Sequence, residues 1–302
     1  MWTQIQYALI YGWIKLHALL PMSVLYVLSD FLYFIVYRVI RYRVSVVRRN
    51  LKAAFPGKSN KELLLLEKKF YHHFADYVVE TLKLAHISLE ELQKRAYVQN
   101  PELIDQLMDK GNPCCLLLMG HFGNWEWYSG STSRFKDACL YQIYRPLNNK
   151  AVDKLFIHLR TKFGSFGIPK NDTGREVVRL VRNKVRSAVI FLADQTPSPS
   201  NLHYWTNFLN QDTAILTGAE RLARKLNTPV VFLDVQMLER GYYTLEMQLI
   251  TDNPKETPEN WITEEYARRM EKSILREPEG WLWTHKRWKY KRSDAVTHHG
   301  NN

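Results

Sequence analysis

The chain has 302 residues, of which 46% are hydrophobic and 24% are charged, so it can bury a large core and is not a disordered protein. Its net charge of +12 favours negatively charged partners, namely nucleic acid, anionic lipid or an acidic protein. Its three cysteines form no C-x-x-C pair, which argues against a disulfide framework and against a structural zinc site.

The most apolar stretch lies near the N-terminus. Between Ala18 and Tyr37, 20 residues contain a single charge, Asp30, and this length is enough to cross the hydrocarbon core of a bilayer. The following segment contains no acid and six basic residues: Arg38, Arg41, Arg43, Arg48, Arg49 and Lys52. Basic residues beside an apolar helix are typical of the cytoplasmic edge of a membrane anchor. We therefore predict that residues 1–55 attach the chain to a membrane, by a helix that spans it or lies in its interface; a buried helix is the alternative.

Residues 56–292 are predicted to alternate between helices and strands. A capping box begins at Ser59 and predicts a helix to about Ala85. Further helices are predicted at Asn149–Phe163, Glu176–Arg182, Thr217–Leu226 and Trp261–Leu275, and strands at Cys114–Met119, Ala138–Tyr144, Ser187–Ala193, Pro229–Val235 and Tyr242–Ile250. The last two strands would form a hairpin. This order predicts one α/β domain with a mixed, mostly parallel central sheet flanked by helices. Residues 293–302 are predicted to be a disordered tail.

One short motif carries a chemical signal. The predicted strand Cys114–Met119 is followed by Gly120 and His121, and Glu126 comes five residues after the histidine. Catalytic groups gather at the carboxyl ends of strands in open α/β sheets. We expect Glu126 to accept the proton-bearing nitrogen of His121, which leaves the other nitrogen to act as a general base. A buried core histidine with an unrelated helix acid is the alternative, because this spacing alone is weak evidence.

Several other kinds of chemistry are disfavoured. The chain contains no H-E-x-x-H, no G-x-S-x-G, no P-loop and no G-x-G-x-x-G, which argues against a zinc protease, a serine hydrolase and a nucleotide as the group donor. We expect neither a metal nor a cofactor.

The motif around His121 resembles the H-x4-D/E motif of the glycerolipid acyltransferase superfamily, and more specifically the late lipid A acyltransferases of Gram-negative bacteria. Four further segments resemble motifs of that family in the same order, nearly to the end of the chain. They are Y-R-P-L-N-N at 144–149, R-T-K-F-G at 160–164, A-D-Q at 193–195 and P-E-G-W-L-W-T-H-K-R-W-K at 278–289. Two places depart from the pattern: Gly280 stands where the family usually has Gln, and Phe208-Leu209-Asn210 stands in place of F-F-G.

The resemblance implies transfer of a fatty acyl chain from acyl carrier protein to a hydroxyl of a lipid A precursor, at the cytoplasmic side of the inner membrane. It implies His121 as the base, Glu126 as its orienting acid, and Arg160 as the group that stabilises the oxyanion. It also implies a set of residues that bind the anionic glycolipid acceptor: Asn124, Arg145, Asp194, Gln195, His285 and Arg287. An enzyme that acylates another glycolipid or a lysophospholipid is the alternative, and a membrane-bound scaffold or nucleic-acid-binding protein is the non-enzymatic alternative.

The C-terminal segment Trp281–Arg292 has three tryptophans, five basic residues and no acid. Interleaved aromatic and basic side chains suit single-stranded nucleic acid as well as a membrane interface. The sequence alone leaves these two nearly even, and the apolar N-terminus together with the resemblance favours the membrane. We therefore expect no nucleic acid among the partners.

Overall fold

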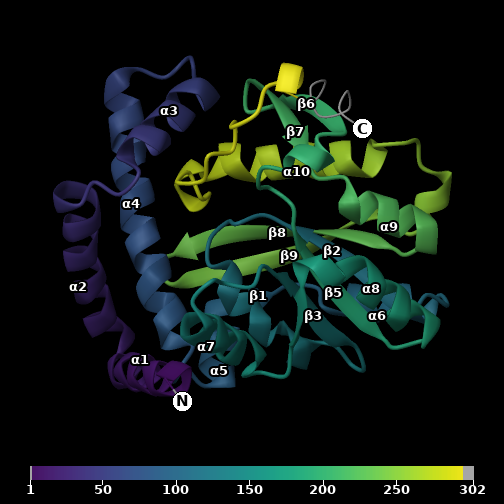
Figure 1. Ribbon diagram of the computed structural model, residues 1–302, viewed down its shortest axis with the longest axis horizontal. Coiled ribbons are helices and arrows are strands. Elements are labelled where there is room, and N and C mark those ends of the chain that lie inside the picture. The colour runs from purple at the N-terminus through teal and green to yellow at the C-terminus, as the bar shows by residue number, and fades with distance from the viewer. Residues whose placement is uncertain (1, 295–302) are drawn as a thin grey trace.

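The computed structural model describes residues 2–294, except for the side chain of Thr132. Its main sheet has seven strands in the order β1-β9-β8-β2-β5-β3-β4 (Figure 1). Their bounds are β1 Ala96–Val98, β2 Cys114–Met119, β3 Cys139–Tyr144, β4 Phe166–Pro169, β5 Ser187–Leu192, β8 Val230–Glu239 and β9 Tyr242–Thr251. Strands β6 (Tyr204–Phe208) and β7 (Gln211–Ile215) form a separate antiparallel hairpin.

Within the main sheet, β8 and β9 form the single antiparallel pair, and all other neighbours are parallel. The predicted mixed, mostly parallel sheet and its closing hairpin are therefore confirmed. Strand β2 is buried at all six positions, because it lies in the middle of the sheet between β8 and β5. Met119 and Leu192, the last residues of β2 and β5, are paired, so both strands end at the same edge.

The five helices predicted in residues 56–292 are present, and two that were not predicted lie between the first of them and β2. The long helix α4 (Asn60–Lys83) begins with the predicted capping box between Ser59 and Glu62. The other predicted helices are α7 Lys150–Thr161, α8 Thr173–Arg182, α9 Gly218–Leu226 and α10 Trp261–Arg276, and the two that were not predicted are α5 Leu89–Arg95 and α6 Glu102–Asp109. In Figure 1, α10 lies on one side of the sheet and α7 on the other, so the sheet is covered on both faces. This burial explains the continuous apolar runs of its central strands.

The N-terminal region consists of α1 (Trp2–Ala18), α2 (Met22–Tyr33) and α3 (Val44–Ala54), and α2 continues as a π-helix to Val39. The predicted single apolar segment is divided by Pro21, which stands at the start of α2. Residues Met22–Val39 are long and apolar enough to cross a membrane. Many large apolar side chains of this region face outward: Trp2, Ile5, Leu9, Trp13, Leu16, Leu19, Val24, Val27, Phe31 and Phe34.

The opposite face of α2 is fastened to α4 by polar contacts, and the two helices lie side by side (Figure 1). Ser29 donates to Asp76 at 2.6 Å, and Tyr26 donates to the buried Glu80 at 3.0 Å. Apolar side chains of α1 and α2 also belong to the same core as the sheet. Ser293 and Asp294, the first residues of the predicted disordered tail, belong to a helical turn at residues 292–294, and the rest of that tail lies outside the described residues.

Candidate active site

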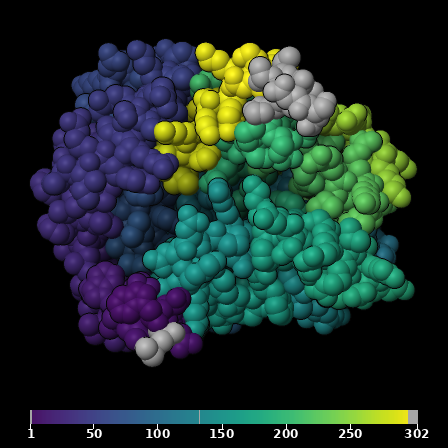
Figure 2. All heavy atoms as spheres, viewed as in Figure 1, coloured from purple at the N-terminus to yellow at the C-terminus, as the bar shows by residue number. Residues whose placement is uncertain are grey.

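A cavity of about 910 Å³ opens at the carboxyl ends of the parallel strands. On the face shown in Figure 2, the surface is hollowed between the teal segments from the middle of the chain and the green and yellow segments that follow them. Four neighbouring strands in the order β2-β5-β3-β4 contribute to it. The residues that follow them and line the cavity are His121 after β2, Gln195 after β5, Arg145 after β3 and Lys170 after β4. The cavity therefore lies at the strand ends, where the strand-end rule predicted the site.

Backbone contacts fix the loop that carries His121. The carbonyl of His121 accepts from the N–H of Leu282, and the N–H of Gly123 donates to the carbonyl of Gly280. Gly123 has a φ of +58°, a conformation that suits glycine, and a Cβ there would meet Val235 at 3.0 Å. The loop is thus held by the C-terminal segment on one side and by β8 on the other.

The acid on the His121 ring is Asp194. Its Oδ1 lies 2.7 Å from His121 Nδ1, and its Oδ2 accepts from the backbone N–H of His121 at 3.0 Å. Trp281 Nε1 donates to the same Oδ2 at 2.8 Å. Asp194 is buried; burial alone would raise the pKa of its carboxyl, but His121 and the Trp281 N–H outweigh this effect and lower the pKa to about 2. An ionised Asp194 holds the proton of the ring on Nδ1 and leaves Nε2 unprotonated, as an acceptor that Gln195 Nε2 contacts at 3.2 Å.

Glu126 has a different partner from the one that we expected. Its two carboxylate oxygens accept from Arg160 Nη2 at 2.6 Å and Arg160 Nε at 2.7 Å, and no hydrogen bond to His121 occurs among the described residues. The chain passes into a 3-10 helix, Trp125–Arg134, directly after Asn124, and this turns Glu126 towards α7. Trp125 packs against the imidazole instead, with 5.0 Å between ring centroids. The predicted His121–Glu126 hydrogen bond was therefore wrong, although both residues line the cavity.

Comparisons with known proteins agree with this geometry. The family described as "Bacterial lipid A biosynthesis acyltransferase" matches residues 2–290. The chain belongs to this family. It is 24% identical over 254 residues to the "Lipid A biosynthesis palmitoleoyltransferase" of Escherichia coli (strain K12), an alignment that covers 82% of the chain and 79% of the relative. The "Lipid A biosynthesis acyltransferase" of Shigella flexneri matches with the same identity and coverage. The protein is an acyltransferase.

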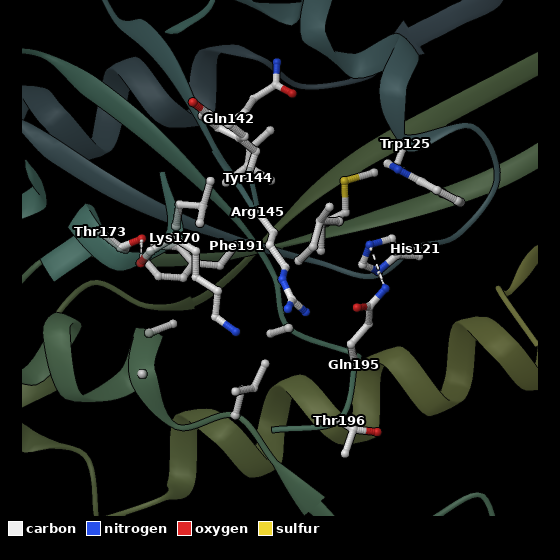
Figure 3. A pocket seen from close by; sticks show the side chains of 18 of the residues that line it. His121, Trp125, Gln142, Tyr144, Arg145, Lys170, Thr173, Phe191, Gln195 and Thr196 are labelled. Carbon is white, nitrogen blue, oxygen red and sulfur yellow. Dashed lines mark hydrogen bonds between the residues drawn. The ribbon is translucent and has the colours of Figure 1, made fainter. Parts of the chain in front are cut away.

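Three of the residues predicted to bind substrate line the cavity of this acyltransferase. Gln195 Nε2 lies 3.2 Å from His121 Nε2, and Arg145 is exposed and points into the same space (Figure 3). His285 also lines the cavity, where its Nε2 accepts from the N–H of Thr196 at 3.1 Å. Burial lowers the pKa of His285 to about 4, so its ring is neutral and serves as a hydrogen-bond acceptor.

Three other predicted substrate ligands, Asn124, Asp194 and Arg287, do not border the cavity. Asn124 is fully buried, and its amide donates to Glu80 of α4 at 2.8 Å. Arg287 is buried and donates to the carbonyl of Ala214 at 2.6 Å. Asn124 and Arg287 therefore support the walls of the site and Asp194 positions His121, so the structure places none of the three in contact with the cavity.

The tryptophans of the C-terminal segment pack into the interior, while its lysines and Arg292 are exposed. Trp281 and Trp283 are buried, and the two rings pack edge to face with 4.7 Å between centroids. Trp288 is partly buried and donates to Thr213 at 2.8 Å. These tryptophans are not available to stack on nucleic-acid bases or to lie at a membrane surface, so neither interpretation can rest on them, and only the basic side chains of the segment remain exposed.

Several cavity residues escaped the sequence analysis. Tyr77 reaches the cavity from α4, and Arg221 and Lys225 reach it from α9. Lys170 was missed because β4 contains glycine and proline and gives no strand pattern. A rule that collects basic residues just after parallel strands finds Lys170 only once β4 is known, and it does not find the residues on helices. Across residues 2–294, no group of three or more His, Cys, Asp or Glu side chains is placed to hold a metal ion.

Proposed function

We propose that this acyltransferase moves a fatty acyl chain from acyl carrier protein to a hydroxyl of a lipid A precursor. The observation that carries the proposal is the 2.7 Å contact between His121 Nδ1 and the buried Asp194, at the edge of a cavity large enough for a lipid substrate. The family and the names of its two relatives support the acceptor class. Acyl carrier protein is acidic, which suits a chain with a net charge of +12.

In the proposed reaction, His121 Nε2 removes the proton of the acceptor hydroxyl as the hydroxyl oxygen attacks the thioester carbonyl carbon. The C–O bond forms, and the carbonyl oxygen becomes an oxyanion. The C–S bond then breaks, and the departing thiolate takes the proton from His121. Asp194 stabilises the imidazolium throughout, as the orienting acid does in catalytic triads. No acyl-enzyme forms, because the thioester is already activated.

Arg160 is the proposed oxyanion stabiliser. Glu126 occupies its Nε and Nη2 groups, and Nη1 makes no hydrogen bond to the described residues. Although burial disfavours the guanidinium charge, the paired Glu126 raises the pKa of Arg160. Glu126 therefore acts through Arg160: it fixes the direction of the guanidinium and keeps it charged. Donors fixed in this way cost no reorganisation when charge develops on the substrate.

We further propose that the N-terminal helices hold the protein on the cytoplasmic face of the inner membrane, with α2 in the interface. The hydrogen bonds of Tyr26 and Ser29 to α4 fasten α2 to the catalytic body, while its apolar side chains face outward. A spanning orientation would have to break these contacts or bury the acids of α4 in lipid. Labelling of a cysteine at the exposed Gln4 of α1, on the N-terminal side of α2, tests this in sealed membrane vesicles. Protection from a reagent on the periplasmic side supports the interface, and labelling from that side contradicts it.

Mass spectrometry of the lipid products tests the reaction itself. After incubation with acyl carrier protein charged with single chain lengths, the wild type should add one acyl mass to the lipid A precursor. His121→Ala should be slower by about 10²–10⁴-fold, the range for loss of a general base. Equal rates for the wild type and His121→Ala would contradict the general-base mechanism. Transfer to a lysophospholipid alone would show that the acceptor is not a lipid A precursor. His86→Ala, a change at an exposed histidine of the α4–α5 turn, is the matched control.

A further inference from the structure

Four basic side chains border the cavity away from His121. They are Arg145 after β3, Lys170 after β4, and Arg221 and Lys225 of α9, and we refer to them as the cationic rim. All four are exposed at the mouth of the cavity. Figure 3 shows Arg145 and Lys170 pointing into the same space that His121 and Gln195 face. Three separate parts of the fold thus direct positive charge at one hollow.

The rim lacks partners of opposite charge. No side chain of the four makes an ion pair with a described residue, whereas Arg175 and Arg179 of the nearby α8 pair with Asp172 and Glu176, each at 2.8 Å. The cavity is lined by two acids, Glu126 and Asp153. Glu126 is neutralised by Arg160, and Asp153 can offset one rim charge, so an excess of three positive charges remains.

Nothing in the fold requires this excess. Lys225 stands in the last turn of α9, where the helix dipole favours a cation. Arg221 lies one turn earlier on the same face of the helix, so the positive charge of Lys225 repels it. Positive charges collected in a hollow and left unpaired suit a ligand that brings the negative charge. The first residues of α9, Gly218 and Ala219, also line the cavity, so the positive end of this helix adds to the potential there.

We propose that the cationic rim binds a phosphate group on the head group of the acceptor glycolipid, and so raises the affinity of the enzyme for this acceptor. This proposal rests on the proposed function, in which the acceptor is such a lipid. The concave shape of the rim favours a small anionic group that enters the cavity, because a folded acidic protein would meet the rim only at its outer edge. Arg145 and Arg221 are suited to phosphate oxygens through paired N–H groups, and the lysines act as point charges.

The test compares the double variant Arg221→Gln/Lys225→Gln with a matched control, Arg182→Gln/Lys255→Gln, which removes the same charges from exposed positions outside the cavity. The full chain is assayed with a phosphorylated acceptor and with the same acceptor after enzymatic dephosphorylation. The KM of the rim variant for the phosphorylated acceptor should rise about tenfold, as expected for lost charge-assisted hydrogen bonds, with kcat within about twofold. The KM for the dephosphorylated acceptor should be the same in both variants.

Binding without turnover separates this proposal from the reaction. Phosphatidylcholine vesicles that contain the phosphorylated glycolipid should bind the rim variant more weakly than the control, and vesicles with the dephosphorylated lipid should bind both equally. This result would support the rim even if the wild type transferred no acyl chain. Equal binding of both variants to the phosphorylated vesicles would overturn it, as would a KM increase confined to acyl carrier protein, which would assign the rim to the donor. Equal thermal midpoints of the two variants would show that both are folded.

Discussion

The two sides of the cavity treat charge in opposite ways. Around His121, each charged group has a partner: Asp194 holds the ring, and Glu126 holds Arg160 at two atoms. Around the cationic rim, none of the four basic side chains forms an ion pair with an acid of residues 2–294. The difference follows from burial, because an unpaired charge in the interior is costly while an exposed charge is hydrated. A catalytic group needs a fixed direction, and a group that binds an anion needs its positive charge left uncompensated.

The largest effect on the catalytic side is expected from a change at Asp194. We expect Asp194→Asn to lower kcat by about 10²–10⁴-fold, because an amide no longer stabilises the imidazolium and can hold the wrong tautomer. Steady-state kinetics with the phosphorylated acceptor measure the loss. Asp212→Asn, at an exposed ion pair with Arg292, is the control and should keep nearly full activity. A kcat within threefold of the wild type in Asp194→Asn would show that the ring does not need this acid.

Asp194→Asn should also change how the free energy of unfolding depends on pH. The carboxyl of Asp194 has a pKa of about 2 in the folded chain against an ordinary value of 3.8, so the folded state favours its ionised form. This contributes about 2 kcal/mol at pH values above 4, and the contribution is lost as the pH falls towards 2. Urea unfolding at pH 6 and at pH 3 should therefore show a smaller difference between wild type and Asp194→Asn at the lower pH.

A double-variant cycle at Glu126 and Arg160 tests whether Glu126 acts on catalysis only through Arg160. If Arg160 stabilises the oxyanion, Arg160→Gln should lower kcat by about 10²–10³-fold. Glu126→Gln should cause a smaller loss, and the double variant should be no slower than Arg160→Gln, because Glu126 acts only through the guanidinium. The rates of the four proteins decide this. Losses that multiply in the double variant would show that Glu126 has a role of its own, such as contact with His121.

Much of the fold followed from sequence patterns because burial imposes them. The run Cys114–Met119 predicted β2 with its bounds, and the capping box at Ser59 predicted the start of α4. Short elements at the edges, such as β4 with its glycine and proline, gave no periodic signal. The hairpin β6–β7 was also missed, because its strands alternate weakly and it stands apart from the main sheet.

The sequence predicted that the candidate site lies at the strand ends, but it did not predict which acid contacts His121. The strand ends correctly located His121 and Asp194, yet local spacing suggested the nearer acid, Glu126, as the partner of the histidine. Asp194 is distant in the sequence and adjacent in space because β2 and β5 pair in register, with Met119 opposite Leu192. Sequence spacing carries no information on such a contact between parallel strands. The register of the sheet decides it.

The smallest expected effect is at His285, on the catalytic side. Burial lowers the pKa of His285 to about 4, below its ordinary value of 6.5, so the unfolded state binds its proton more readily than the folded state. The stability from the neutral ring is therefore complete above pH 6.5 and is lost as the pH falls towards 4. His285→Gln keeps an acceptor for the Thr196 N–H and does not titrate.

The thermal midpoints of wild type and His285→Gln should differ little at pH 7.5, and the wild type should lose more stability than the variant between pH 7 and pH 5. The exposed His86→Gln variant should follow the wild type throughout. If His285→Gln also followed the wild type at every pH, the ring would not be held neutral, and the link between Thr196 and the C-terminal segment would need another basis. A difference between the thermal midpoints of wild type and His285→Gln that grows as the pH falls would show that the fold keeps the buried His285 uncharged. The catalytic side of the cavity would then exclude unpaired charge, whereas the cationic rim on the other side keeps four unpaired charges.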